Sequence, residues 1–297
     1  MGSRLLPIFA ILLIAVVVSH AALPSEVYWD KVLPNTPMPK AVRELLRPGH
    51  KGKPVVVIAD YDFANYLQNY AASEDQLHAD PNVPFFLEKD LKSGTKMNVH
   101  FTRTTNGARF LPRKVAEAIP LSSNKFPEVL KQFSVEPQSM EAEAMKQTVK
   151  ECEKPASQEE EEKSCATSLE SMVDFITSNL GKHVQPMSTE IDKQETPKQK
   201  YIIAPGVKKM GGENSVVCHK QTYAYAVFYC HKTKSTEAYK VPLVGADGTK
   251  ATAVAVCHTD TSKWNPKHLA FQVLKVKPGT VPICHFLPED HIVWTSN

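Results

Sequence analysis

The sequence lacks the motifs that most often reveal a catalytic site. It has no Gly-x-Ser-x-Gly of serine hydrolases, no phosphate-binding P-loop and no Gly-x-Gly-x-x-Gly of dinucleotide-binding proteins. None of its cysteines has the Cys-x2-Cys spacing of zinc fingers. These absences argue against a serine hydrolase of that type, a nucleotide-dependent enzyme and a zinc-finger protein.

The sequence also lacks an excess of either charge. Its 35 Lys and Arg residues stand against 32 Asp and Glu residues, which gives a formal net charge of +3. Basic residues do not alternate with aromatic residues in a stripe, as they often do on nucleic-acid-binding surfaces. We therefore expect no nucleic-acid partner. No Asn-x-Ser/Thr acceptor for N-glycosylation occurs either.

Long apolar segments are scarce. Residues 5–18 form an apolar stretch that is short for a membrane span and follows Arg4. Small residues at Ser19 and Ala21 suit a signal peptidase, so we interpret residues 1–21 as a signal peptide, with cleavage after Ala22 as the alternative. No other apolar run reaches 18 residues, and we expect no membrane segment after signal removal. The secretory route leads to the extracellular space and cell wall or to the protein storage vacuole.

Six cysteines follow this segment, at Cys152, Cys165, Cys218, Cys230, Cys257 and Cys284. An even number of cysteines in an oxidising compartment favours disulfides over free thiols. Six cysteines allow fifteen pairings, and the sequence leaves the choice open. The twelve residues between Cys152 and Cys165 would suit a local disulfide.

The first half of the chain contains a leader and several helical patterns. Residues 22–84 are predicted to be a partly disordered leader or linker, with a short helix around Ala41–Leu46. The clearest helix is Cys165–Leu180, because its apolar residues recur with a period of 3.6 and Gly181 follows it. The acidic run Glu159–Glu162 before this helix is predicted to be a solvated loop.

The second half of the chain has the patterns of strands. The expected strands are Thr222–His231, the hairpin of Ala238–Val244 and Ala251–His258, and the short segments Val281–Phe286 and His291–Trp294. A helical first half followed by a β-rich second half predicts an α+β fold.

Four Cys-His dipeptides form the most specific pattern: Cys218-His219, Cys230-His231, Cys257-His258 and Cys284-His285. The gaps between them are 10, 25 and 25 residues. This spacing resembles that of the plant BURP domain family. Two further segments support the resemblance, PFFLEKDLKSGTKMNVHF at 84–101 and FLPRKVAEAIPLSSNKFPEVL at 110–130. The resemblance implies one disulfide-stabilised BURP domain over residues 85–297.

The dipeptides also suggest a metal site. Neighbouring residues of a strand point to opposite faces, so each dipeptide sends its sulfur one way and its imidazole the other. If the sulfurs form disulfides, only imidazoles remain as ligands, and an all-nitrogen set suits Cu(II) or Zn(II), of which copper binds more tightly. Some BURP family members are copper-dependent peptide cyclases, and the resemblance implies the candidate copper ligands His219, His231, His258 and His285. Additional candidates in the same region are His100, His268 and His291, and we expect the cysteines to form a structural framework.

The resemblance implies two alternative functions. Non-enzymatic family members include seed and embryo proteins, dehydration-responsive proteins and a subunit associated with polygalacturonase. The short N-terminal region without repeats favours this class, with a role in seed development, the cell wall or stress responses and with partners in the cell wall or storage vacuole. The alternative is a copper-dependent cyclase that crosslinks Trp or Tyr side chains. Because residues 101–200 contain neither Trp nor Tyr, a cyclase would be expected to act on a separate peptide rather than on its own chain.

Overall fold

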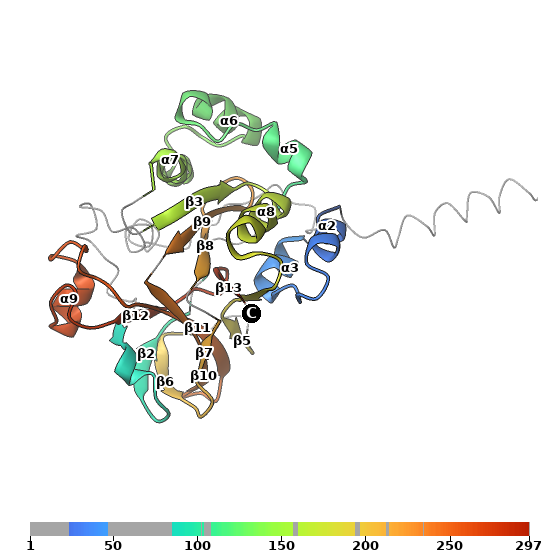
Figure 1. The fold of residues 1–297 in the computed structure, drawn as a ribbon. Helices are drawn as coiled ribbons and strands as arrows, with labels where there is room; N and C mark the ends of the chain where they lie inside the picture. The colour runs from blue at the N-terminus through green and yellow to red at the C-terminus, as the bar shows by residue number, and fades with distance from the viewer. Residues whose placement is uncertain are drawn as a thin grey trace, which may run out of the picture.

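The computed structural model describes residues 24–46 and 85–296, apart from short gaps at 102, 104–107, 157–159, 194–196, 212–213 and 234. The expected signal peptide, residues 1–21, and the linker residues 47–84 lie outside the described residues. Figure 1 shows two β-sheets that lie next to each other, with helices on the periphery. This arrangement confirms the predicted α+β class, although two short strands already occur in the first half of the chain.

The first sheet has five antiparallel strands. Their order is β3 (Glu160–Ala166), β9 (Val227–Thr233), β8 (Ser215–Gln221), β13 (Ile292–Ser296) and β4 (Val184–Met187). The central strand β8 is buried along its whole length. Both faces of this sheet are therefore covered by other parts of the protein.

The second sheet has eight strands and is curled. Its main path runs β1 (Phe86–Leu87), β12 (Ile283–Phe286), β11 (Lys250–His258), β10 (Thr236–Gly245), β6 (Gln199–Ile203) and β2 (Lys96–Val99), with β5 (Glu190–Ile191) on β11 and β7 (Lys208–Met210) on β10. Phe101, just after β2, lies 5.9 Å from Phe286 of β12 between ring centroids, although β2 and β12 are separated by three strands in the sheet order. The sheet therefore curls around an apolar interior, which includes Tyr201 and Val241.

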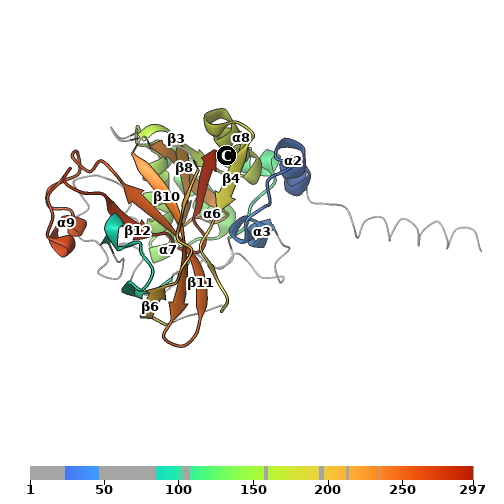
Figure 2. The same ribbon diagram turned by 60° about the horizontal axis from the view of Figure 1, so that its bottom comes forward.

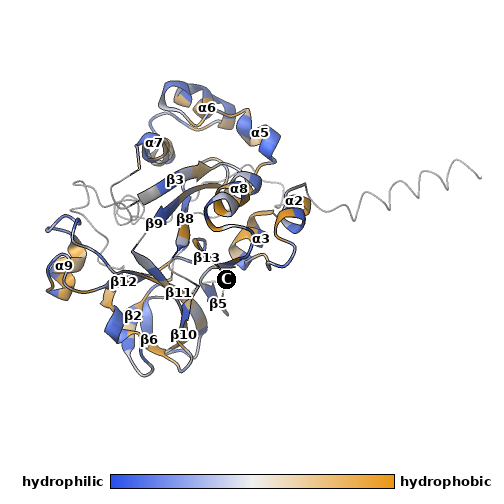
Figure 3. Cartoon of the chain, viewed as in Figure 1, coloured by the Kyte–Doolittle hydropathy of each residue, from blue (hydrophilic) through white to orange (hydrophobic). Residues whose placement is uncertain are grey.

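Seven α-helices occur in the described part of the chain. Helices α2 (Pro24–Val32), α3 (Lys40–Leu46) and α8 (Leu169–Leu180) cover one face of the five-stranded sheet. Helices α5 (Arg113–Glu117), α6 (Phe126–Phe133) and α7 (Met140–Glu153) form a separate lobe near β3, with the 3-10 turn η3 (Ser123–Lys125) between α5 and α6. Helix α9 (Leu269–Leu274), largely hydrophobic in Figure 3, lies beside the eight-stranded sheet, and the 3-10 turn η2 (Glu88–Asp90) follows β1.

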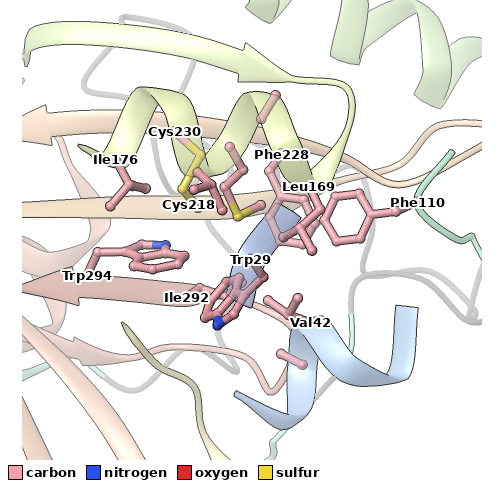
Figure 4. Packing of buried hydrophobic residues seen from close by; sticks show 14 of the residues in the cluster. Trp29, Val42, Phe110, Leu169, Ile176, Cys218, Phe228, Cys230, Ile292 and Trp294 are labelled. Carbon is pink, nitrogen blue, oxygen red and sulfur yellow. A yellow bond between two sulfur atoms is a disulfide. The ribbon is translucent and has the colours of Figure 1, made fainter. Parts of the chain in front are cut away.

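The core between the helices and the five-stranded sheet includes the two described helices of the leader. Trp29 of α2 is 1% exposed, and its ring lies 5.5 Å from that of Trp294 in β13. Val42 of α3 is fully buried in the same cluster. Figure 4 shows these side chains beneath α8, together with the disulfide between Cys218 and Cys230. Residues 24–46 therefore belong to the hydrophobic core, although they precede the expected domain start at residue 85.

A second apolar layer joins the two sheets. Val217 and Val293 of the five-stranded sheet pack with Ala238, Val254 and Val256 of the eight-stranded sheet. These residues belong to β8, β13, β10 and β11, which lie close together in Figure 2. The inner face of the five-stranded sheet therefore faces the outer face of the curled sheet.

The predicted elements agree with the structure to different degrees. The hairpin of β10 and β11 and the end of α8 at Gly181, which has a φ of 77°, are confirmed. The acidic run was expected to be a loop, but Glu160–Ala166 forms strand β3, and α8 begins later than predicted, at Leu169. The predicted strand Thr222–His231 is also corrected, because residues 222–226 connect β8 to β9 and the strand itself is Val227–Thr233.

Candidate metal centre

The five-stranded sheet presents two histidines from adjacent strands. Cys218 of β8 is paired in register with Cys230 of β9, and the two form a disulfide with Cα atoms 4.0 Å apart. Both cysteines are fully buried in the core beneath the helices. Because side chains alternate along a strand, His219 and His231 project from the opposite face, toward the second sheet.

The eight-stranded sheet repeats this arrangement. Cys257 of β11 is paired in register with Cys284 of β12, and their disulfide also has Cα atoms 4.0 Å apart. Both sulfurs lie in the interior of the curled sheet. His258 and His285 therefore project from its outer face, which is turned toward the five-stranded sheet.

The four imidazoles form two stacked pairs. The rings of His219 and His231 have centroids 5.1 Å apart and an interplanar angle of 18°, and their Nε2 atoms are separated by 3.0 Å. The rings of His258 and His285 stack with centroids 5.6 Å apart and the same angle. Positive charge on His258 or His285 lowers the pKa of His219, so the two pairs are close enough to interact electrostatically. The four candidate ligands thus lie in two pairs within electrostatic range of each other, and we call these imidazoles, with the neighbouring histidines described next, the histidine cluster.

Two of the three additional candidates belong to the same cluster. His291, just before β13, has its Nδ1 atom 2.9 Å from the Nδ1 atom of His219. His268 precedes α9, and Trp264 lies next to it and next to His258, with centroid distances of 4.7 and 4.9 Å. His100 is exposed and makes no ring contact with the cluster among the described residues.

Burial favours the neutral form of five histidines of the cluster. Desolvation is the largest cause of the lowered pKa of His219 and His258, and it lowers the pKa of His268, His285 and His291 to about 4. Neighbouring imidazoles lower these values further for most of them. Neutral imidazole is the form that binds a metal ion, so the environment favours the ligand state at neutral pH.

The donor atoms fit a metal ion that prefers nitrogen. Two imidazole nitrogens bound to one ion at ~2.0–2.1 Å are separated by roughly 2.9–3.4 Å, and the Nε2 atoms of His219 and His231 have such a separation. No thiolate ligand is present among the described residues, because none of their cysteines is free. In the described part of the chain, no set of three or more His, Cys, Asp or Glu side chains is arranged as a complete metal site. The fit therefore rests on the nature and burial of the donors and on the spacing of this pair.

The third disulfide lies outside this cluster. It joins Cys152 of α7 to Cys165 of β3, which is the local pairing expected from their spacing. Cys165 packs with the helices of the separate lobe. This disulfide therefore attaches the lobe to the edge of the five-stranded sheet.

Comparison with known proteins identifies the family. The sequence pattern that defines the BURP domain matches residues 84–296. The chain belongs to the BURP domain family. Within this BURP domain, the matched region contains all six cysteines and the six histidines of the cluster.

Relatives of this BURP-domain chain occur in several plants. It is 58% identical over 253 residues to BURP domain-containing protein 3 of Oryza sativa subsp. japonica, covering 83% of this chain and 58% of that protein. The same identity and length relate it to BURP domain protein RD22 of Arabidopsis thaliana, of which 64% is covered. Rice BURP domain-containing protein 5 is 46% identical over 289 residues, which cover 93% of this chain and 88% of that protein. The chain thus spans about six tenths of the length of the first two relatives.

The BURP domain also contains site features that sequence reasoning missed. Phe85 and Trp264 flank the histidines, and their rings contact His268. Phe85 belongs to the segment 84–101 that resembles the family, whereas Trp264 stands in no recognised motif, and only the fold brings the two residues to the cluster. None of the helices in the described ranges is both long and apolar enough to cross a membrane.

Proposed function

We propose that this BURP-domain chain is a secretory-pathway plant protein that acts without enzymatic activity in seed development, the cell wall or stress responses, and that its histidine cluster holds copper. The observation that carries the copper proposal is the convergence of four imidazoles from two sheets while the adjacent cysteines are all in disulfides. Family membership and the resemblance to non-enzymatic members support the proposed biological role.

Copper would be held by nitrogens from both sheets. His219 and His231 come from the five-stranded sheet, and His258 and His285 come from the eight-stranded sheet, with His291 beside the first pair. A bound Cu(II) ion would supply a strong bond between elements that otherwise pack through apolar contacts. The role of the chain's own residues is to keep these imidazoles neutral, buried and oriented.

The burial of the cluster supports a structural role over catalysis. His219, His231 and His285 are 5%, 7% and 4% exposed, whereas His258 is half-buried. A peptide side chain would therefore have to approach from the side of His258. Such limited access suits a metal that stabilises the fold or a binding surface.

The test is the metal content of the purified protein after copper loading and removal of loosely bound metal, measured by elemental mass spectrometry. Wild type is expected to retain about one or two copper ions per chain, because the two histidine pairs supply one or two nitrogen sites. A variant with His219, His231, His258 and His285 changed to Ala should retain none. The matched control changes His100 and His183, both exposed and outside the cluster, to Ala and should bind as wild type does.

Two outcomes would contradict the copper proposal. One is a wild-type protein that stays metal-free after loading, and the other is a four-histidine variant that retains the same copper content. Circular dichroism of each variant shows whether it is folded. The cellular role is tested separately by replacing the gene with the four-histidine variant and following protein location and seed or stress phenotypes.

The alternative function is a copper-dependent peptide cyclase acting on a separate peptide. The all-nitrogen donor set favours it, because such sites suit Cu(II), a redox-active ion. Copper-loaded protein incubated in air with peptides containing Trp or Tyr would then produce peptides lighter by two hydrogens per crosslink. Unchanged peptide masses, with copper bound, would support the non-enzymatic function.

A further inference from the structure

A charged cavity lies on the other side of the five-stranded sheet from the histidine cluster. Lys220 follows His219 in β8, so its side chain points to the opposite face, toward α3. The cavity measures about 170 Å³ and is lined by residues of α3 and β8, by Arg103, Ala108 and Arg109, and by the two residues that precede His291. Its charged lining residues are Lys40, Glu44, Arg103, Arg109, Lys220, Glu289 and Asp290.

Most of these charges are paired with one another. Arg103 binds Glu44 and Glu289, with nitrogen–oxygen distances of 2.8 and 3.0 Å. Lys220, which is 1% exposed, lies 4.0 Å from Asp290. Lys40 lies at the rim, 3.8 Å from Glu44. The three carboxylates thus have cationic partners within the lining itself.

Arg109 is different from the other cations of the lining. Its Nη1 atom is buried and has no hydrogen-bond partner in the described part of the chain, and it forms no ion pair there. Its backbone is fixed, because its carbonyl accepts a hydrogen bond of 2.8 Å from the amide of Ala226. Arginine stays protonated at all physiological pH values. A buried guanidinium N–H without an acceptor is costly, and such groups usually face a bound water or ion.

We infer that this cavity is a binding site for a small monoanionic carboxylate, with Arg109 as its main hydrogen-bond donor. The described residues of the lining include four cations and three anions, 4 − 3 = +1, so a single negative charge balances them. The planar guanidinium matches a carboxylate in shape and donor spacing. A phosphate dianion fits less well, because Glu289 and Asp290 at the cavity would repel its second charge.

Two sources of such a carboxylate are a free organic acid and the C-terminus of a peptide. Both present the same group to Arg109. The volume of about 170 Å³ holds the carboxylate and a few further atoms, so a peptide would enter with its last residue only. Because α3 supplies one wall, the site includes residues that precede the family-matched region.

The experiment is a calorimetric titration of the purified, metal-free protein with acetate, N-acetylglycine, acetamide and inorganic phosphate. Acetate and N-acetylglycine are expected to saturate one site, and acetamide is expected not to bind, since it lacks the charge. Tighter binding of N-acetylglycine than of acetate assigns the site to a peptide C-terminus, and equal binding assigns it to the carboxylate group alone. No saturable carboxylate binding, equal binding of acetamide, or stronger binding of phosphate overturns the inference.

A set of variants locates the site. Arg109→Gln should weaken carboxylate binding about ten-fold or more, because it removes a hydrogen bond to a charged group. Arg109→Lys keeps the charge and should weaken binding by a smaller factor, which keeps the test usable if the Gln variant does not fold. Arg43→Gln is the matched control, since Arg43 is on α3 but outside this lining. Binding that is equal in wild type and in a folded Arg109 variant overturns the assignment to this cavity.

Discussion

Trp29 offers a direct test of whether the leader helices are part of the folded core. The residue lies in α2, before the region that matches the family, yet it is 1% exposed and packs on Trp294. Its indole Nε1 donates a hydrogen bond of 2.9 Å to the carbonyl of Thr36, and Thr36 in turn donates one to the carbonyl of Val184 in β4. Trp29→Ala removes the ring that links α2, this turn and the five-stranded sheet.

The expected cost of this substitution is large. Replacing a buried Phe or Trp by Ala typically costs about 3–5 kcal/mol, from lost burial and from the cavity left behind. For a domain of this size each kcal/mol lowers the melting temperature by roughly 2–4 °C, so we expect a decrease of roughly 6–20 °C. Because native proteins are stable by only about 5–15 kcal/mol, the variant is expected to be near the limit of folding.

The assay is urea unfolding followed by far-UV circular dichroism, which does not depend on tryptophan fluorescence. Val27→Ala is the matched control, because Val27 is in the same helix and is 52% exposed. The control is expected to change the free energy of unfolding by less than about 0.5 kcal/mol. If Trp29→Ala were as stable as this control, α2 would not contribute to the core, and the domain would start near residue 85.

Three other predictions address the disulfides, the histidines and one turn. Changing Cys257 and Cys284 together to Ala should lower the free energy of unfolding in urea by about 3.5 kcal/mol, because the disulfide closes a loop with a sequence separation of 27, and it should also reduce copper retention. Changing Cys152 and Cys165 together to Ala should cost about 3 kcal/mol and leave copper bound. Equal copper loss in the two variants would contradict the proposed site. Burial holds the pKa of His268, His285 and His291 at about 4, below the ordinary 6.5, so the unfolded chain takes up protons first as pH falls. The metal-free protein should therefore have its full histidine contribution above pH 6.5 and lose it as pH falls to about 4, and a urea midpoint that is constant in this window would refute the assignment. Gly211→Ala should be strongly destabilising, because φ is +61° and a Cβ would lie 2.3 Å from the Cβ of Thr295. Gly94→Ala should cost only about 1 kcal/mol, because φ is +88° but no atom lies within 4 Å of the added Cβ. Similar melting temperatures for the two variants would contradict this prediction.

The placement of sulfur and imidazole on opposite faces was predictable from the sequence because strand alternation is a local rule. Each Cys-His dipeptide places sulfur and imidazole on opposite faces, and the structure has both cysteine pairs in disulfides and the four imidazoles in two stacked pairs. The choice among pairings was not predictable, because it depends on which strands are neighbours. His291 and His268 were candidates only by their position in the region, since their contacts arise from a loop and from the start of α9.

The errors in the fold prediction have a common physical origin. The acidic run has no alternating pattern, but β3 pairs with β9 along the sheet edge, so its backbone hydrogen bonds decide its conformation. Likewise, the run at 222–226 alternates Tyr with Ala as a strand would. In the structure, Tyr223 and Tyr225 are buried against the helical lobe rather than in a sheet. Tertiary contacts overruled local patterns in both places.

The alternation of sulfur and imidazole also means that oxidation of the cysteines decides which donor atoms the chain keeps available. Before oxidation, each dipeptide carries a thiol on one face of its strand and an imidazole on the other, and sulfur ligands favour soft ions such as Cu(I). After oxidation the sulfurs are enclosed in two separate cores, and only nitrogens face the space between the sheets. Oxidation thus removes the sulfur donors and leaves a nitrogen-only set between the sheets, which is the donor type that Cu(II) prefers.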